Sequence, residues 1–316
     1  MGSAIAKFAF MPPDQACSRA YLDTCSNVEY VQSRDGTRIS FMCFPTPTAR
    51  GLTYTLLYCH GNAEDLSRFG SRHIRMPGNR LGIDYLVAEL RAMSYEPEVQ
   101  PFEPQPGVPS SNVWVTIRGT VNPDLVVVVS SHLDSEDVSP GADDNGSGTC
   151  ALLEIARVLK DRPQANTMVL LWVTGEEEGL LGSKEWVRRA RAAGMRVVAN
   201  LNNDTFGWTR HGRLESTVRF SNPAFRDIEH GAALLFTDLV TYDARMFQSS
   251  DGLSFFDQYG DIVGGYGSYP ILASPHYHQS HDAVETISPR QIAEVAKATL
   301  ASLMLLASTP APLAGR

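Results

Sequence analysis

From about residue 66 onward, the hydrophobic pattern alternates between the period of an amphipathic helix and short, almost continuous apolar runs. The helical period predicts helices at 82–93, 147–159, 182–193, 225–240 and 289–307, and the apolar runs predict strands at 113–118, 125–131, 167–173 and 197–202. Residues 125–131, LVVVVSS, are apolar on both faces, which is typical of a strand inside a mainly parallel sheet. This alternation predicts an α/β fold, a three-layer α/β/α sandwich with a mixed, mainly parallel central sheet.

The first 65 residues have a different pattern. Three short strands are predicted at 30–34, 38–44 and 52–58, with turns at Asp35-Gly36 and Arg50-Gly51. Residues 309–316 are rich in Pro, Ala and Gly and are expected to form a frayed tail. We therefore expect an N-terminal segment at 1–65, a main domain at 66–308 and a tail at 309–316.

Composition places the chain among globular proteins and excludes some functions. Of its 316 residues 43% are hydrophobic and 20% charged, and the formal net charge is −8 without a block of basic residues, which argues against nucleic-acid binding. No window approaches 18 uninterrupted apolar residues and no signal-peptide pattern is visible, so neither a transmembrane segment nor secretion is expected. The five cysteines include no CxxC pair and are interpreted as reduced thiols, which favours a cytoplasmic location. The oligomeric state cannot be predicted.

Residues able to bind a metal ion follow several predicted strands or lie in nearby loops. These are His132 and Asp134, Asp143 and Asp144, the three glutamates 176–178, Asp204, and His278 in a late loop. Any one of them alone would most simply be a helix cap or a surface residue. Together they would be a costly set of buried charges without a cation, because the carboxyl ends of parallel strands face one crevice. Two histidines and three carboxylates form the ligand set that a pair of zinc ions needs.

These motifs also carry a resemblance. HLDS, PGADDNGSG, GEEEGLLGS, LNND and YHQSHD, in this order, are similar to zinc metallopeptidase family twenty-eight over about residues 66–308. That family includes leucine-type aminopeptidases, a glutamate carboxypeptidase and, more distantly, glutaminyl cyclase. The resemblance implies the zinc-exopeptidase fold.

It also implies a role for each residue. Two Zn²⁺ ions are the expected cofactors; their implied ligands are His132 and Asp204 on one ion, Glu177 and His278 on the other, and Asp144 between them. The implied catalytic residues are Glu176 as general base, Tyr277 as donor to the oxyanion, and Asp134 as the carboxylate that fixes the His132 tautomer. On this alignment His276 and His281 are surface residues outside the ligand set.

The expected function is that of a zinc-dependent aminopeptidase acting on peptides with a free N-terminus, by a zinc-activated water and a general base. A carboxypeptidase, a glutaminyl cyclase and a non-catalytic binding module are the alternatives. No arginine cluster accompanies the motifs, which argues against binding of a substrate carboxylate. His132 argues against the cyclases, which lack this histidine, and the complete ligand set argues against the binding module. Ser250-Asp251-Gly252 departs from the Ser-Asp-His of the family, so substrate specificity cannot be transferred.

A second resemblance concerns residues 1–65. RDGTRISFM and YTLLYCHGNAEDL resemble the N-terminal part of a depalmitoylase-like α/β-hydrolase. The chain has no GxSxG pentapeptide, so this fragment cannot supply a serine-hydrolase triad by itself.

Overall fold

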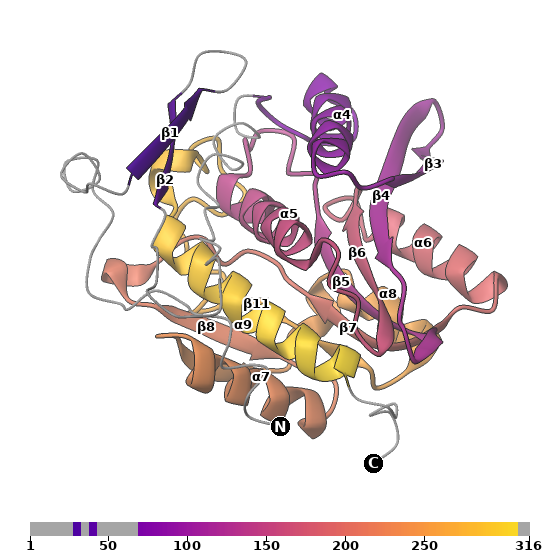
Figure 1. The fold of residues 1–316 in the computed structure, drawn as a ribbon. Helices are drawn as coiled ribbons and strands as arrows, with labels where there is room; N and C mark the ends of the chain where they lie inside the picture. The colour runs from indigo at the N-terminus through magenta and orange to yellow at the C-terminus, as the bar shows by residue number, and fades with distance from the viewer. Residues whose placement is uncertain (1–27, 33–37, 43–68, 309–316) are drawn as a thin grey trace.

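A six-stranded sheet in the order β10-β7-β5-β6-β4-β3 forms the centre of the computed structural model, which describes residues 28–32, 38–42 and 69–308 (Figure 1). Its strands are β3 (Glu98–Gln105), β4 (Val108–Ile117), β5 (Asn122–His132), β6 (Asn166–Val173), β7 (Arg196–Asn202) and β10 (Val263–Gly264). The strands β10, β7, β5 and β6 pair in parallel, whereas β4 pairs antiparallel with both β6 and β3. The predicted mixed, mainly parallel sheet is confirmed.

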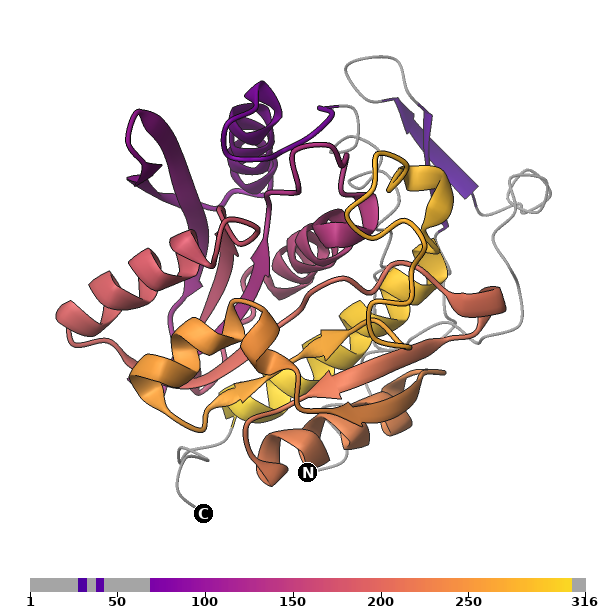
Figure 2. The ribbon, with the colours of Figure 1, turned by 180° about the vertical axis from the view of Figure 1, so that it is seen from behind.

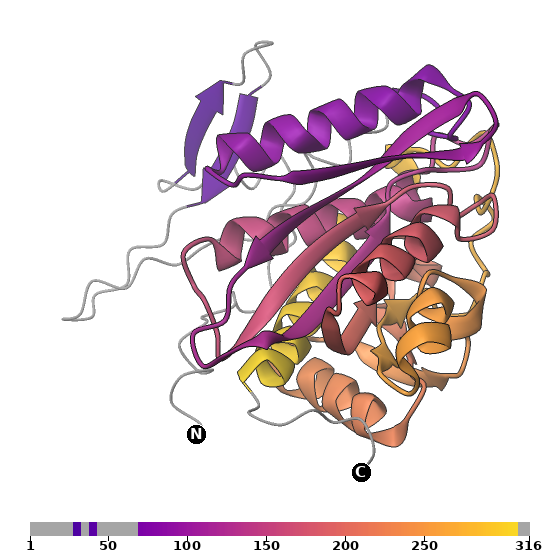
Figure 3. The same ribbon diagram turned by 90° about the vertical axis from the view of Figure 1, so that its right-hand side faces the viewer.

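Helices cover both faces of this sheet. On one face lie α4 (Pro77–Ala92), α5 (Gly148–Leu159) and α9 (Pro289–Ser308), and on the other α6 (Leu181–Ala192) and α8 (Gly252–Tyr259) (Figure 3). Every residue of β6 is buried between the two layers, as its continuous apolar sequence predicts. The three-layer α/β/α sandwich is therefore confirmed.

A smaller sheet extends the molecule beyond β10. It has the order β11-β8-β9, with β8 (Glu215–Arg219), β9 (Val240–Ala244) and β11 (Tyr266–Gly267), and α7 (Pro223–Phe236) packs between it and α9 (Figure 2). The prediction of a helix through residue 240 is wrong at its end, because Thr237 adopts an extended backbone and Val240 begins β9. The apolar residues Leu239 and Val240 continue the helical period by chance, so the period alone does not indicate that the helix ends at Phe236.

Helix α9 illustrates how local sequence sets an element. Pro289 is its first residue, and the Ser288 hydroxyl accepts the backbone N–H of Gln291 at 3.3 Å, which caps the N-terminus of the helix. Among the described helices it alone is long and apolar enough to cross a membrane, and 72% of its most apolar window is buried inside the protein. It packs against α5 and α7, which is the arrangement of a core helix.

The N-terminal segment is described only in part. β1 (Val28–Gln32) and β2 (Arg38–Met42) form an antiparallel pair, with Tyr30 opposite Ser40, close to the two strands predicted there. The predicted strand at 52–58, both predicted turns and the tail at 309–316 lie outside the described residues. The domain boundary at residues 65 and 66 stays a prediction.

Candidate metal centre and cleft

The predicted ligands converge at the carboxyl ends of three neighbouring strands. His132 is the last residue of β5, Glu177 follows β6 and Asp204 follows β7. Parallel pairing of β5 with β6 and with β7 aligns these three ends at one edge of the sheet. The turn η1 (Ala142–Ser147) contributes Asp144, and the loop between β11 and the short helix η4 (Val284–Thr286) contributes His278.

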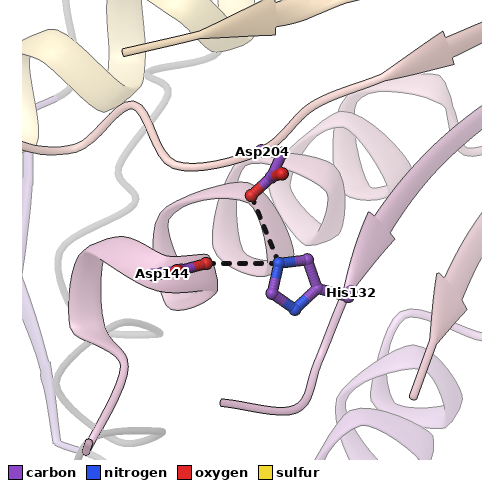
Figure 4. A group of neighbouring side chains, drawn as sticks. All are labelled: His132, Asp144 and Asp204. Carbon is purple, nitrogen blue, oxygen red and sulfur yellow. Dashed lines mark hydrogen bonds and ion pairs between the residues drawn. The ribbon is translucent and has the colours of Figure 1, made fainter. Parts of the chain in front are cut away.

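The Asp144 carboxylate faces both histidines. Its Oδ1 atom lies 3.2 Å from His132 Nε2, and its Oδ2 atom lies 3.1 Å from His278 Nε2. Each histidine also faces a second carboxylate: Asp204 Oδ1 is 3.2 Å from His132 Nε2, and Glu177 Oε2 is 3.2 Å from His278 Nε2. Figure 4 shows the first of these groups, in which Asp144 and Asp204 point at the same ring nitrogen. Two imidazole–carboxylate groups therefore share Asp144.

The electrostatic environment of this cluster favours positive charge. Burial alone would lower the pKa of His132, but the surrounding carboxylates of Asp134, Asp144 and Asp204 raise it well above its ordinary value. Burial raises the pKa of Glu177 to about 8, and the charge of Asp144 adds to this shift. Carboxylates packed this closely need a neutralising cation to remain ionised in a buried site.

Unpartnered atoms point to the same conclusion. Glu177 Oε1 and His278 Nε2 are buried and have no hydrogen-bond partner among the described residues, although two carboxylate oxygens lie close to the nitrogen. Donor atoms of His132, Asp144 and Asp204 lie within 4.8 Å of one another, as do those of Glu136, Glu177 and His278. Imidazole nitrogen and carboxylate oxygen are ligands that suit zinc, so the residues present fit a zinc centre.

Asp134 lies beside His132 with a geometry that differs from the expected one. His132 Nδ1 is 3.2 Å from the Asp134 backbone carbonyl oxygen and 3.7 Å from the Asp134 carboxylate. The nearer acceptor for an imidazole N–H is therefore the carbonyl group. The other carboxylate oxygen accepts the backbone N–H of Glu177 at 3.3 Å, so Asp134 connects the ends of β5 and β6.

Glu176 and Tyr277, the two other predicted catalytic residues, line one cleft together with four of the metal-ligand candidates, Asp144, Glu177, Asp204 and His278. A Glu176 carboxylate oxygen lies within 4.8 Å of donor atoms of His132 and Glu177. Burial raises the pKa of Glu176 well above its usual range, although the proximity of His132 acts in the opposite direction. The Tyr277 ring stacks on His278, with ring centroids 3.7 Å apart and planes 22° apart.

The cleft has a volume of about 340 Å³. Around the predicted residues Asp144, Glu176, Glu177, Asp204, Tyr277 and His278, its lining is completed by Glu136, Gly179, Leu180, Thr205, Arg219, Gln248, Ser249 and Leu272. His276 and His281 are not part of this lining. Their rings contact each other at the surface instead.

Two residues of the cleft that contact the candidate ligand carboxylates, Thr205 and Arg219, were not predicted from the sequence. The Thr205 hydroxyl contacts Asp144 Oδ1 at 3.1 Å and Asp204 Oδ1 at 2.8 Å. Arg219 is buried and donates to both the carboxylate and the backbone carbonyl of Asp204, each at 3.2 Å. Burial raises the pKa of Asp204, but His132 and Arg219 together outweigh it, so that the net pKa is lowered. The position of Thr205 directly after Asp204 was an available signal; Arg219 had none, because it ends a strand that the pattern does not reveal.

A buried arginine supports the loops that carry the ligands. Arg72 donates to the backbone carbonyls of Leu133 at 2.7 Å, Pro140 at 2.6 Å and Gly141 at 2.8 Å. Leu133 directly follows His132, and Gly141 directly precedes η1. One guanidinium therefore fixes the end of β5 against the turn that contains Asp144.

Comparison with known proteins gives a consistent result. Residues 112–303 match the family model described as "Peptidase family M28". A "Probable zinc metalloprotease" of Pyricularia oryzae is 31% identical over 258 residues, covering 63% of this chain and 50% of that protein. A "Probable leucine aminopeptidase" of Trichophyton verrucosum is 30% identical, covering 63% of this chain and 56% of that protein. The chain thus spans about half the length of the curated relatives it matches.

Solved structures share the fold. LapB from Legionella pneumophila superposes with a TM-score of 0.71 at 17% identity, over 80% of this chain and 72% of that one. BSAP, a zinc aminopeptidase from Bacillus subtilis, superposes with a TM-score of 0.70 at 17% identity, over 80% of this chain and 96% of that one. A glutaminyl cyclase from Bacteroides thetaiotaomicron also superposes, with a TM-score of 0.66 at 17% identity, over 78% of this chain and 96% of that one. At these identities the likeness establishes the fold alone, and the fold accommodates both chemistries.

Proposed function

The chain belongs to peptidase family M28, and from this premise we propose that it is a di-zinc aminopeptidase that removes N-terminal residues from peptides. The observation that carries the proposal is the position of Asp144 between two imidazole–carboxylate groups. A carboxylate whose two oxygens face two separate ligand groups is suited to bridge two cations rather than to bind one. The names of the curated relatives, zinc metalloprotease and leucine aminopeptidase, support the same activity.

On this proposal His132 and Asp204 would hold one zinc ion, Glu177 and His278 would hold the other, and Asp144 would contribute a ligand to each. When bound, the two ions supply an acidified water molecule and a Lewis acid for the scissile carbonyl. Arg219 contacts the Asp204 oxygen that does not face His132, and the Thr205 hydroxyl contacts the Oδ1 atoms of both Asp144 and Asp204. Both residues therefore help to orient these two carboxylates.

Glu176 is the proposed general base. It lies in the cleft, close to donor atoms of both His132 and Glu177, and its burial raises its pKa. A carboxyl group of raised pKa can accept a proton from the attacking water and return it to the leaving amine near neutral pH. The Tyr277 ring stacks on His278, which holds the side chain in place. Its hydroxyl is the proposed donor to the developing oxyanion.

The charges of the cleft favour an aminopeptidase over a carboxypeptidase. Acidic side chains at 136, 176 and 204 offer oxygen atoms for the free ammonium group of a peptide. Arg219 is the single arginine or lysine among the described residues that line the cleft, and its guanidinium is engaged by Asp204. A carboxypeptidase needs an available cation for the substrate carboxylate, and Arg219 does not provide one.

Three substrates separate the candidate activities: an aminoacyl p-nitroanilide, its N-acetylated form, and an N-blocked dipeptide with a free carboxylate. We expect the zinc-loaded protein to cleave only the first and to lose this activity on removal of zinc by a chelator. Cleavage of the N-blocked dipeptide alone would identify a carboxypeptidase. Cyclisation of a peptide with N-terminal glutamine, without hydrolysis of any of the three, would identify a cyclase.

Metal stoichiometry tests the proposal that the chain binds two zinc ions. We expect elemental analysis to find two zinc ions per chain in the active protein. One zinc per chain at full activity would contradict the bridging role of Asp144.

A further inference from the structure

Two further imidazoles lie outside the cleft, on either side of Tyr277 and His278. His276 Nδ1 and His281 Nδ1 are 2.9 Å apart, and the two ring planes are almost perpendicular, at 89°. We propose that His276 and His281 form a separate site for a divalent transition-metal ion of the Cu²⁺ or Ni²⁺ class. Such an ion would join the two ends of the loop that carries Tyr277 and His278.

The backbone of the loop builds this site. The N–H of Gln279 donates to the His276 carbonyl at 2.9 Å, and the N–H of Asp282 donates to the Gln279 carbonyl at 3.0 Å. These two consecutive turns reverse the chain and return residue 281 to residue 276. Asp282, the next residue, is buried and hydrogen-bonded to the Asp144 turn, so the end of the loop is anchored. The approach of the two histidines therefore follows from hydrogen bonds that do not involve their side chains.

The donor atoms suit a metal ion. Two ring nitrogens at hydrogen-bond distance can share one proton, or both can present lone pairs to a cation. Nitrogens 2.9 Å apart, each about 2.0–2.1 Å from a metal ion, subtend an angle of about 90° at that ion. This is the angle between adjacent ligands in the tetragonal geometry of Cu²⁺ and Ni²⁺, whereas tetrahedral zinc would need the nitrogens about 3.3 Å apart.

Solvent access supports the assignment and separates it from the zinc centre. His281 is exposed and His276 half-buried, so water molecules can complete the coordination of an ion there. His278 adopts a left-handed backbone, with φ of 58°, and directs its Nε2 atom at Asp144 and Glu177 in the cleft. The flanking histidines contact each other instead and are not among the cleft residues. The two sites thus use different side chains of one loop.

Metal counting tests the proposal. Zinc-loaded protein is dialysed to equilibrium against Ni²⁺, and total metal per chain is then measured by elemental analysis. We expect the wild type to hold one more equivalent than either His276→Gln or His281→Gln. The matched control is His211→Gln, which removes another exposed histidine and should keep the extra equivalent.

Since the measurement is a difference in total metal, exchange of zinc for nickel in the cleft does not affect it. It is also independent of whether the cleft binds one zinc or two, and of any peptidase activity. Equal totals in the wild type and both variants would overturn the proposal. Copper supplies an independent readout on the wild type alone: the electron paramagnetic resonance spectrum of the first equivalent of Cu²⁺ added to the zinc-loaded protein should show two nitrogen ligands. A spectrum with oxygen ligands only would overturn it equally.

Discussion

The Asp282 carboxylate accepts the backbone N–H of Asp144 at 3.0 Å, and its second oxygen accepts the N–H of Asp143 at 2.9 Å. The Asp282 carbonyl also accepts the N–H of Ala142 at 3.0 Å. Asp282 therefore holds the η1 turn through three backbone groups, while it ends the loop that carries His278. The positions of two proposed ligands, Asp144 and His278, thus depend on one buried aspartate.

We expect Asp282→Asn to weaken zinc binding by about 10–100-fold, the usual effect of removing a group that orients a ligand. The amide can accept only one of the two backbone N–H groups, and its NH₂ would oppose the other. Competition with a chromophoric chelator measures the affinity, and Asp257→Asn, at an exposed position of α8, is the matched control. Unchanged affinity in a folded Asp282→Asn protein would show that the turn keeps its shape without this carboxylate.

The three adjacent glutamates at 176–178 provide a comparison within one loop. We expect Glu176→Gln to retain both zinc ions and to lower kcat by about 10²–10⁴-fold, because general-base catalysis contributes about that factor. Glu177→Gln should lose zinc as well as activity. Glu178→Gln is the control, since Glu178 contacts His73 Nε2 at 2.5 Å and Gln105 Nε2 at 2.6 Å rather than the cleft. Activity and zinc content are measured on the same samples. If Glu176→Gln lost zinc and Glu177→Gln kept it, Glu176 would be the zinc ligand and Glu177 the general base.

The sheet could be predicted where a strand is buried on both faces. β6 and the middle of β5 have almost continuous apolar sequences, and β7 is largely buried, so local pattern and tertiary environment agree. β3 could not be predicted, because it is a partly exposed edge strand that contains Pro101 and Pro104. The short strands β8 to β11 could not be predicted either. They form contacts with α7 and with one another that the hydrophobic period of their own sequences does not indicate.

The convergence of the candidate ligands could be predicted because metal-binding residue types stand at the ends of neighbouring strands. Arg219 was missed because its role arises from the position of β8 beside the end of β7, a relation between distant segments. The same reason applies to Arg72, whose three carbonyl partners lie more than sixty residues away in sequence. Side chains that orient ligands act through tertiary contacts, so their role becomes visible only in the folded chain.

Glu229 provides a prediction on stability and pH. It is fully buried in α7; one carboxylate oxygen accepts the Gly265 N–H, and the other has no hydrogen-bond partner among the described residues. Burial raises its pKa well above the ordinary value, although the Gly265 N–H opposes the shift. A carboxyl group with a raised folded-state pKa binds a proton on folding. Its contribution to stability is therefore complete below the unfolded-state pKa and is lost as pH rises through the folded-state pKa.

We expect Glu229→Gln to be more stable than the wild type at pH 8 and to lose this advantage near pH 4. The amide oxygen can still accept the Gly265 N–H, and no charge has to be buried. Between the two pKa values the free energy of unfolding of the wild type should fall by up to about 1.4 kcal/mol per pH unit relative to the variant. Urea unfolding at several pH values measures this, with Glu285→Gln, at an exposed position, as the control for loss of one charge. A pH-independent difference would place the ionised carboxylate in a solvated environment.

Arg72 provides the last prediction, because its guanidinium fixes the two loops from which His132 and Asp144 project. Arg72→Met keeps the length of the side chain but removes the guanidinium from the three accepting carbonyls. The Gly141 carbonyl still accepts the Gly146 N–H, so two carbonyls, those of Leu133 and Pro140, lose their donor. A buried acceptor without a partner costs about 1–3 kcal/mol, so we expect the free energy of unfolding to fall by at least about 2 kcal/mol. That is a large share of a typical stability of about 5–15 kcal/mol. Arg72→Lys should recover only part of the loss, because one ammonium group cannot reproduce the planar fork of donors.

Arg75→Met is the matched control for Arg72→Met: Arg75 is three residues away, exposed, and hydrogen-bonded to Gln105, so its loss should change stability by less than about 0.5 kcal/mol. Denaturant unfolding of the zinc-free proteins measures the free energy of unfolding. The zinc affinity of the folded variants measures whether the loops still position the proposed ligands. We expect Arg72→Met to lose both stability and zinc affinity, and Arg75→Met to keep both. Stability within 1 kcal/mol of the wild type together with unchanged zinc affinity would mean that water replaces the guanidinium without moving either loop.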